Sequence, residues 1–415
     1  MKPNASYSAL GRIRKLFIFD TTEYVLKDEP FPFWKIKERY QDLALSLNRF
    51  NTDEKTEIYI FFRINPYSFK AFPNHDRELN LYFVPVNVLL PSASIPTDWL
   101  QDIIHVSGNG KLLVAQKMIG PDMIEILRRY THADEVRRIP RPCPGGNILR
   151  GNLNGADYML HGYTPESDCN PYELSKHFGI DMENMILAYD GDMDEFDELF
   201  YHADLYTTIV GPVEDENGDS RELILLAKCD ELSDSRVRKG LDDLQVRMQE
   251  LRQARPLSDG KSALIFDLLP FVTLSQQEDG TICHALSYNN CLVENFTDKK
   301  GMPRIRMYFP DYRREMQTLI DRQSENEEAM RQLAKKIYAA SKVNKLSNDV
   351  KPGKPLTYKH TVAFLDGVHE VIRETLAKYG ITEVEFVKHD FRSMAQRLGS
   401  LRCMTKVVER DCLPG

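Results

Sequence analysis

The sequence predicts an α/β protein, and two observations carry this prediction. Short runs rich in apolar, β-branched and aromatic residues recur along the 415-residue chain, as strands would. Between several of these runs, apolar residues recur every three or four positions, as on one face of a helix. Alternation of the two patterns is typical of strand–helix–strand units. The predicted strands are residues 15–20, 57–62, 79–90, 111–117, 185–190, 205–212, 222–228, 263–269, 305–309, 384–388 and 404–408.

Three helices are predicted from the same patterns. Apolar side chains step by three and four through residues 237–251 and again through residues 312–340. A third helix, residues 368–379, is expected to end before Gly380, because glycine readily adopts the left-handed conformation that ends many helices. Residues 345–355 are rich in Lys, Pro and Gly and are expected to form a loop before the last helix–strand pair.

Composition and charge exclude several classes of protein. No apolar run approaches the roughly 18 residues needed to cross a bilayer, so we expect no membrane association. The net charge of −8 argues against a nucleic-acid binder and suits a small cationic substrate better. The LFIF run near the N-terminus is too short for the core of a signal peptide, which predicts a cytoplasmic protein. Seven cysteines without a CxxC pair indicate reduced thiols, and we expect neither a metal site nor a cofactor.

The first candidate site residues are Trp99 and Asp102. They precede two strand-like runs that a Gly-Asn-Gly turn joins. A carboxylate in this place can bind a cationic substrate. The competing interpretation is a solvated loop aspartate, since Asp is common in turns.

A second candidate is the Gly145-Gly146-Asn147 sequence, which leads into a strand-like run. It has neither the lysine of a P-loop nor the spacing of a dinucleotide-binding fingerprint, so phosphate binding is not predicted. A tight turn is the simpler interpretation.

The acidic run at residues 190–198 lacks the glycine and glutamate positions of a calcium-binding loop. A solvated acidic loop is the leading interpretation, and steering of a cationic substrate is the alternative.

His202 and Asp204 lie two positions apart at the start of an apolar strand-like run. Residues i and i+2 of a strand face the same side, so we expect the imidazole and the carboxylate to point into one pocket. A structural histidine beside an unrelated aspartate is the competing interpretation.

The last candidate is Cys403, within the segment GSLRCMTKVVER. This thiol follows a small Gly-Ser pair and precedes a strand-like run. A buried cysteine is usually an inert core residue, so its assignment depends on partners elsewhere in the chain. Cys143 and Cys291 lack a comparable turn, and we do not expect them to react.

Taken in order, these motifs resemble those of the guanidine-modifying enzymes of the pentein superfamily, which includes agmatine, peptidyl-arginine and free-arginine deiminases, amidinotransferases and dihydrolases. The resemblance spans about residues 90–408. This chain departs from the family pattern at Pro144, where many relatives have a carboxylate, and at Arg402, where several have histidine. The matching stretches are Trp99-Leu100-Gln101-Asp102, Gly145-Gly146-Asn147, His202-Ala203-Asp204, Ser287–Asn295 and Gly399–Thr405.

The resemblance implies an α/β propeller of five ββαβ-like modules with pseudo-fivefold symmetry and a site in the central cavity. One catalytic domain would span residues 1–415, with helical additions near 232–252 and 312–343.

The resemblance also implies the roles of the site residues. Asp102 and Asp204 would bind the guanidinium, Cys403 would attack its carbon, and His202 would act as acid and base. Contacts to the substrate would come from Trp99, Asn147 and Arg402.

The implied activity is hydrolysis of a guanidino group, most simply by a deiminase that acts on arginine or an arginine derivative and releases ammonia. A protein-bound arginine stays open as substrate, and so does an oligomeric state. One alternative is an amidinotransferase or an arginine dihydrolase that uses the same cysteine and histidine. Another alternative, from a different class, is a non-catalytic binding scaffold of the same fold.

Overall fold

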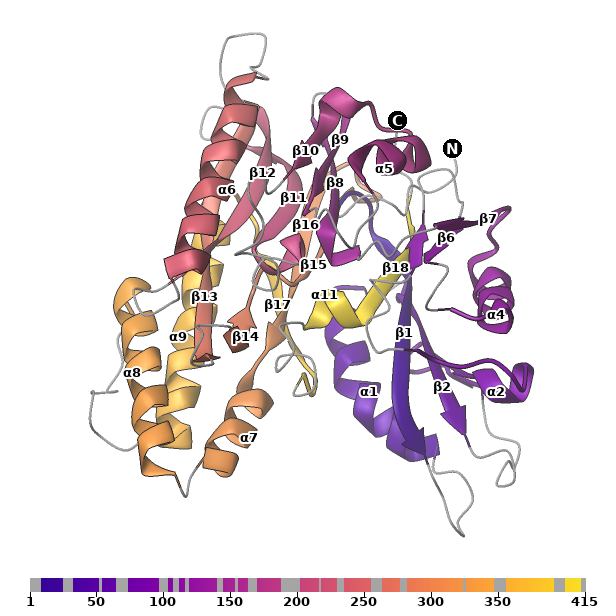
Figure 1. The fold of residues 1–415 in the computed structure, drawn as a ribbon, viewed down its shortest axis with the longest axis horizontal. Helices are drawn as coiled ribbons and strands as arrows, with labels where there is room; N and C mark the ends of the chain where they lie inside the picture. Colours follow the sequence, from indigo (N-terminus) through magenta and orange to yellow (C-terminus); the bar gives the residue numbers. More distant parts are fainter. Residues whose placement is uncertain are drawn as a thin grey trace.

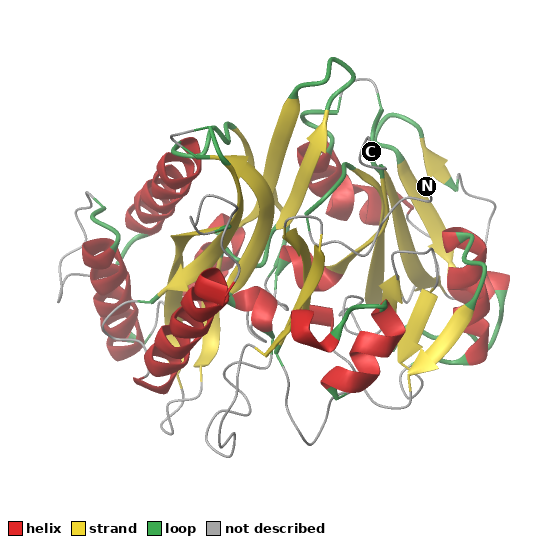
Figure 2. Cartoon of the chain, turned by 90° about the horizontal axis from the view of Figure 1, so that it is seen from above, coloured by secondary structure: helices red, strands yellow, loops and turns green. Residues whose placement is uncertain are grey.

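The computed structural model describes most of the chain. The described residues are 9–24, 33–51, 54–64, 74–96, 104–106, 112–115, 119–139, 145–153, 156–162, 170–187, 202–215, 218–229, 235–254, 263–276, 282–323, 326–346, 356–391 and 400–411. The fold is mixed α/β, as predicted, and its described strands form five sheets. Figures 1 and 2 show most helices on the outside of the molecule, against strands that lie nearer its middle.

One unit recurs in all five sheets: two antiparallel strands, then a helical segment, then a strand parallel to the second strand. Two units are small. The first contains β5 (Ile104–Val106), β6 (Leu112–Ala115), α4 (Pro121–Thr131) and β7 (Val136–Ile139). The second contains β8 (Ile148–Leu153), β9 (Ala156–His161), α5 (Pro171–Phe178) and β10 (Met185–Leu187), with the short helix η3 (Met182–Asn184) before β10.

Two further units carry longer helices. One contains β11 (Thr207–Glu214), β12 (Ser220–Lys228), α6 (Ser235–Ala254) and β13 (Leu264–Gln276), and β14 (Ile282–Ser287) extends its sheet. The other contains β15 (Leu292–Thr297), β16 (Pro303–Asp311), three helices, α7 (Arg313–Gln323), α8 (Glu327–Val343) and α9 (Tyr358–Ala377), and then β17 (Glu383–Lys388). Helix α6 therefore has the position that α4 and α5 have in their units.

The fifth unit joins the two ends of the chain. Its strands are β18 (Thr405–Arg410), β1 (Ile13–Tyr24) and β2 (Glu57–Ile64), with α1 (Phe33–Leu47) between β1 and β2. Strands β4 (Leu81–Pro85) and β3 (His75–Asp76) extend this sheet. The first strand of the unit thus comes from the end of the sequence and the other two from its beginning, as the contrast of indigo β1 and yellow β18 in Figure 1 shows.

A buried cation links this fifth sheet to its neighbour. The guanidinium of Arg410 donates hydrogen bonds from Nη1 to the carbonyl oxygens of Ala9, Gly11 and Val293, at 3.1, 2.7 and 2.8 Å. Burial lowers the pKa of Arg410 to about 10, so the side chain stays charged near neutrality. One side chain near the end of the described chain thus satisfies two carbonyls near its beginning and one carbonyl of β15.

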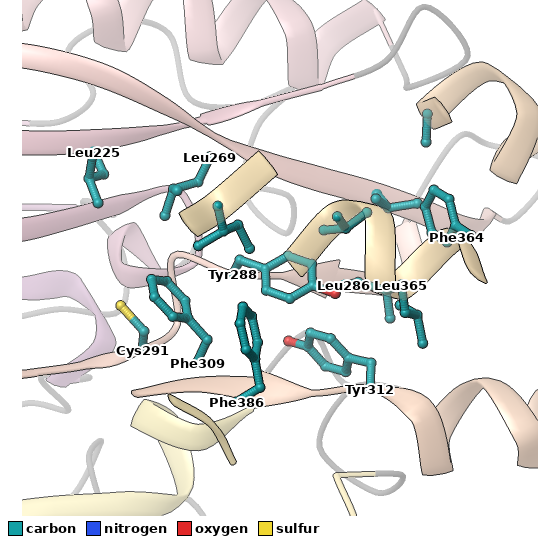
Figure 3. Packing of buried hydrophobic residues seen from close by; sticks show 14 of the residues in the cluster. Leu225, Leu269, Leu286, Tyr288, Cys291, Phe309, Tyr312, Phe364, Leu365 and Phe386 are labelled. Atoms are coloured by element: carbon teal, nitrogen blue, oxygen red, sulfur yellow. The ribbon is translucent and has the colours of Figure 1, made fainter. Parts of the chain in front are cut away.

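The largest core cluster lies between the long-helix units. Phe309 of β16 and Phe386 of β17 stack with their ring centroids 5.7 Å apart, and Tyr288 meets Tyr312 edge to face at 5.3 Å. Figure 3 shows these four rings close together, with Cys291 at one side of the group. Helices α8 and α9 cover this core through contacts with β13.

The structure confirms most predicted strands and revises three predicted elements. Residues 79–90 are not one strand, because β4 ends at Pro85 and a short helix, α2 (Val86–Leu89), follows. Residues 312–340 are two helices, because Asn326 caps a new one by accepting a hydrogen bond from the amide of Ala329. The helix predicted at 368–379 begins at Tyr358.

Three of the longer described helices were not predicted, although two of them have local signals. Asn170 caps α5, Pro171 begins it, and Gly179 follows it in the left-handed conformation. Helix α4 likewise begins with a proline, Pro121. Helix α1 is the third. Among the described residues, no helix has the length and apolar character needed to cross a bilayer.

Candidate active site

Three short segments from different units converge on the candidate site. They are the single-turn helices η2 (Gly145–Asn147), η5 (Ala203–Leu205) and α11 (Leu401–Met404), which precede β8, β11 and β18. Helix η2 contacts both η5 and α11. In Figure 1, α11 is the yellow helix near the middle of the ribbon. Each strand thus fixes a turn at its start, and the turns meet although up to 258 residues separate them in sequence (403 − 145).

Cys403 lies on α11 and is fully buried. Its Sγ lies 3.9 Å from both carboxylate oxygens of Asp204 and 4.0 Å from Nδ1 of His202. Both of these side chains are also buried. A thiol beside an imidazole is the arrangement that nucleophilic catalysis by cysteine requires.

The predicted location of His202 and Asp204 on a strand is wrong. Asp204 lies within the 3-10 helix η5, His202 is its N-cap residue, and β11 begins only at Thr207. Both side chains nevertheless approach the same sulfur, because a single tight turn can bring positions i and i+2 to one partner.

Asn147 holds this turn in place. Its Oδ1 accepts a hydrogen bond from the backbone amide of Ala203, between the two site residues, at 3.1 Å. Its own backbone oxygen accepts the amide of Gly162 at 2.9 Å. The side chain is fully buried. The contacts of Asn147 are therefore those of a residue that positions the His-x-Asp turn.

Gly146 lets η2 approach the site closely. A Cβ atom at this position would lie 2.5 Å from Nδ1 of His202 and 3.0 Å from Oδ1 of Asp204. No side chain fits there without moving the imidazole. The Gly-Gly-Asn sequence is thus the turn that was expected, and its second glycine is needed for space.

Arg402 forms an ion pair inside the site. Its Nε lies 3.2 Å from Oδ2 of Asp204, and its side chain is 13% exposed. The carboxylate assigned to the substrate guanidinium therefore holds a guanidinium of the chain itself. This counterion offsets the cost of burying Asp204 beside a thiol.

Asn290 was not selected from the sequence, although the Ser287–Asn295 stretch that contains it was noted. Its Nδ2 donates to Sγ of Cys403 at 3.0 Å, and its Oδ1 accepts the amide of Cys403 at 3.1 Å. The side chain is fully buried. The signal available in the sequence was a pair of adjacent asparagines before a strand, which local pattern alone does not connect to Cys403.

Two predicted site residues, Trp99 and Asp102, lie outside the described residues. The same holds for the acidic run at 190–198 and for Cys143 and Pro144. The structure therefore brings together five of the seven predicted residues: Asn147, His202, Asp204, Arg402 and Cys403.

Cys291 differs from Cys403 in its surroundings. It is buried in the largest core cluster, where its thiol meets the hydroxyl of Thr208 at 3.7 Å. Burial raises the pKa of the Cys291 thiol to about 12. This thiol is therefore neutral near pH 7, in agreement with its prediction as an unreactive cysteine.

The donor atoms of His202, Asp204 and Cys403 all lie within 4.8 Å of one another, a spacing that one metal ion could bridge. The Arg402 guanidinium on Asp204 already supplies a positive charge at this point. A second cation would have to displace it, and we assign no metal ligands here.

Solved structures share this fold. An agmatine deiminase of C. jejuni has a TM-score of 0.50 and 15% identity over 99% of this chain and 96% of its own. An agmatine deiminase of Enterococcus faecalis has a TM-score of 0.51 and 12% identity over 99% of this chain and 98% of its own. No protein-family model matches the sequence, and no curated protein matches it either. These likenesses show that the chain shares its fold with the two agmatine deiminases, in agreement with the resemblance that the motifs indicated.

Proposed function

We propose that this protein is a guanidino-group hydrolase, a deiminase that acts on arginine or an arginine derivative and releases ammonia. One observation carries the proposal: the buried Sγ of Cys403 lies within 4.0 Å of both His202 Nδ1 and the Asp204 carboxylate. These groups are the nucleophile, the acid–base group and the cation-binding group that attack on a guanidinium needs. The solved agmatine deiminases of the same fold support this reading.

Substrate binding begins with the carboxylates. A guanidinium is planar and permanently charged, so the bidentate hydrogen bonds that it would donate to Asp204 and Asp102 would orient it and hold its carbon near Cys403. Because Arg402 already pairs with Asp204, the substrate must take over the place of that guanidinium. The contacts of Trp99, Asn147 and Arg402 with the substrate remain part of the proposal.

The chemistry then proceeds in two steps. The thiolate of Cys403 adds to the guanidinium carbon, and its new C–S bond forms while His202 gives a proton to the departing amine. Cleavage of the C–N bond releases ammonia and leaves a covalent thiouronium. Water, which gives a proton to His202, then adds to the same carbon. Cleavage of the C–S bond returns the thiolate and yields the ureido product. The sum is guanidinium plus water to urea group plus ammonium.

The wider architecture is also part of this proposal. We propose that the five β-β-α-β units are the five modules of a propeller around a pseudo-fivefold axis and that residues 1–415 form one catalytic domain. Helices α7 and α8 best match the predicted helical additions. Each unit needs one helix before its last strand, and in this unit α9 already supplies the helix before β17. A cytoplasmic location belongs to the proposal as well.

The test is ammonia release from arginine, agmatine, N-modified arginines and an arginine peptide. Wild type should release one ammonia per turnover from one of these substrates, and Cys403→Ala should release none. Cys229→Ala is the matched control, because it removes a thiol that lies outside the site, beside another core cluster.

Other outcomes would favour the alternatives. Two ammonia molecules per turnover would indicate a dihydrolase. Ammonia-free turnover that requires an added amine acceptor would indicate an amidinotransferase. Binding of a guanidino compound without turnover, unchanged in Cys403→Ala, would contradict the proposal and favour a binding scaffold.

A further inference from the structure

We propose that Asn290 is a positioning residue that holds the Cys403 turn and stabilises the thiolate of Cys403. As a statement about catalysis, this inference rests on the proposed function. As a statement about the thiol, it stands on the geometry of the described residues alone.

The amide oxygen of Asn290 organises the backbone around the nucleophile. Oδ1 accepts hydrogen bonds from the amides of Ser400, Arg402 and Cys403, at 3.2, 3.0 and 3.1 Å, and from the hydroxyl of Ser400 at 3.0 Å. These donors lie at the start of a helix of only four residues. One buried side chain therefore fixes the conformation of the whole turn that carries the thiol.

This arrangement fixes the orientation of the amide. Backbone N–H groups can only donate, so the side of the amide that faces them must be the oxygen. The NH₂ group of Asn290 must then face Sγ of Cys403, 3.0 Å away. Because an NH₂ group can only donate, the sulfur is forced into the role of acceptor.

Because the NH₂ group of Asn290 can only donate to Sγ of Cys403, it favours the thiolate over the neutral thiol. A thiolate accepts hydrogen bonds well and a neutral thiol accepts them weakly, so donation from Asn290 lowers the free energy of the thiolate relative to the thiol. The charged and titratable described groups that face Cys403 are His202, Asp204, Arg402 and Tyr312. Asn290 itself does not titrate, and its substitution keeps all four of these groups in the chain.

The experiment measures the titration of the Cys403 thiol by the ultraviolet absorbance of its thiolate. Each protein is compared with the same protein carrying Cys403→Ala, which removes the signal of the other six cysteines. Asn290→Asp keeps the shape and the accepting oxygen and replaces the NH₂ donor. Asn290→Ala removes the donor without adding a charge, and it keeps the test valid if the aspartate variant does not fold.

Asn289→Asp is the matched control. Asn289 is the adjacent residue and is equally buried, but its Nδ2 donates to the carbonyl oxygen of Leu225 at 2.9 Å and to the hydroxyl of Thr208. Its substitution perturbs the same strand start without touching Cys403.

We expect the titration midpoint of the Cys403 thiol to rise by about one to two pH units in both Asn290 variants. The free energy of a hydrogen bond to a charged group corresponds to a shift of about that size. The midpoint of Asn289→Asp should match wild type. An unchanged midpoint in folded Asn290 variants would overturn the inference, and so would an equal rise in the Asn289 control. A purely structural role would lower thermal stability and leave the midpoint where it was.

Ammonia release supplies a second readout. With the identified substrate, the Asn290 variants should lower kcat and change KM little, because the missing interaction acts on the nucleophile and not on the bound guanidinium. The thiol titration needs no substrate. If wild type releases no ammonia and the midpoint still shifts, the proposed function fails and the assignment of Asn290 stands.

Discussion

At the candidate site, close contacts between individual atoms limit which side chain each position can hold. Asp204 meets Arg402, Cys403 and the η2 turn at once, and each of these contacts involves a buried or nearly buried group. Solvent cannot relax a misplaced polar group in such a setting. Small substitutions should therefore change activity more than they change stability.

The first test of this view is Gly146→Ala. The added methyl group would start 2.5 Å from Nδ1 of His202, so the imidazole must move away from Cys403. A displacement of about 1 Å at reacting groups can cost about 100-fold in rate, and we expect a loss of that order in kcat/KM for ammonia release.

Gly367→Ala is the control for this substitution. The three described atoms nearest its Cβ would all belong to the side chain of Leu346, the first at an ordinary contact distance of 3.4 Å. Activity within about twofold of wild type is expected there, since the site is untouched. Equal losses in the two variants would contradict the steric argument.

A second test concerns Arg402. Its guanidinium pairs with the carboxylate of Asp204, so a guanidino substrate must compete with it for that carboxylate. Arg402→Gln should lower KM for the substrate by about three- to tenfold, because that competitor is gone. Arg402→Lys keeps the positive charge and should stay closer to wild type. A higher KM in Arg402→Gln would contradict this prediction and would show that the proposed substrate contact of Arg402 outweighs its competition for Asp204.

Among the secondary-structure elements, α9 illustrates how capping sets a boundary. Thr357 and His360 form a capping box in which the threonine side chain accepts the amide of His360 and the histidine ring accepts the amide of Thr357. The helix begins ten residues before the predicted start at 368, and it includes Gly367, although glycine has a low helix propensity. In the structure Gly367 packs against Leu346, which lets the helix continue through it.

Thr357→Ala tests this cap. Loss of the threonine acceptor should lower the free energy of unfolding by about 1 kcal/mol, as loss of an N-cap does elsewhere. Urea unfolding followed by circular dichroism measures the change.

Thr318→Ala is the matched substitution inside a helix. Thr318 is half-buried on α7, and its hydroxyl donates a hydrogen bond to the carbonyl oxygen of Arg314 at 3.1 Å. Alanine has the higher helix propensity, so this variant should be neutral or slightly more stable. If Thr357→Ala is also neutral or slightly more stable, the capping contribution of Thr357 is excluded.

For the molecule as a whole, buried titratable groups set the pH dependence of stability. Burial lowers the pKa of His389 to about 4 and that of His369 to about 3. In the unfolded chain these histidines titrate near 6.5, so between these values the unfolded state binds more protons. Stability from the neutral histidines is present above pH 6.5 and is lost as pH falls.

Glu222 acts in the opposite direction. Burial raises its pKa to about 8, and its carboxyl group accepts a hydrogen bond from the hydroxyl of Tyr158 at 3.0 Å. The folded state then keeps a proton that the unfolded chain has lost, so this contribution is present below about pH 4.5 and is lost as pH rises towards 8.

His389→Phe tests whether the neutral His389 causes the loss of stability at acidic pH. His389 stacks on Tyr40, with ring centroids 5.4 Å apart, and phenylalanine keeps an aromatic ring without a titrating group. Between pH 6.5 and 4 wild type should lose roughly 3 kcal/mol of unfolding free energy through this histidine, and the variant should lose correspondingly less. Urea unfolding at several pH values gives both slopes. Parallel slopes would rule out His389 as a source of the acid sensitivity.

Local sequence was sufficient for the α/β class and most strands, and it drew attention to the candidate residues that lie on the described turns. Period-two and period-3.6 patterns arise within a few residues, and small-residue turns before Cys403 and after Cys143 are visible in the same way. The order of the motifs along the chain then related Cys403 to His202 and Asp204.

Only the tertiary packing determined which of these residues contact one another and on which element the His-x-Asp pair lies. Asn290 meets Cys403 across 113 residues, and Arg402 reaches Asp204 across 198, because the turns at the starts of strands from different units lie beside one another. No local sequence pattern indicates contacts between residues so far apart in the chain. The structure also moved the His-x-Asp pair from a strand to a 3-10 turn, because Asn147, from another unit, holds the amide of Ala203. Side chains distant in sequence acquire their roles only when the sheets bring their turns together.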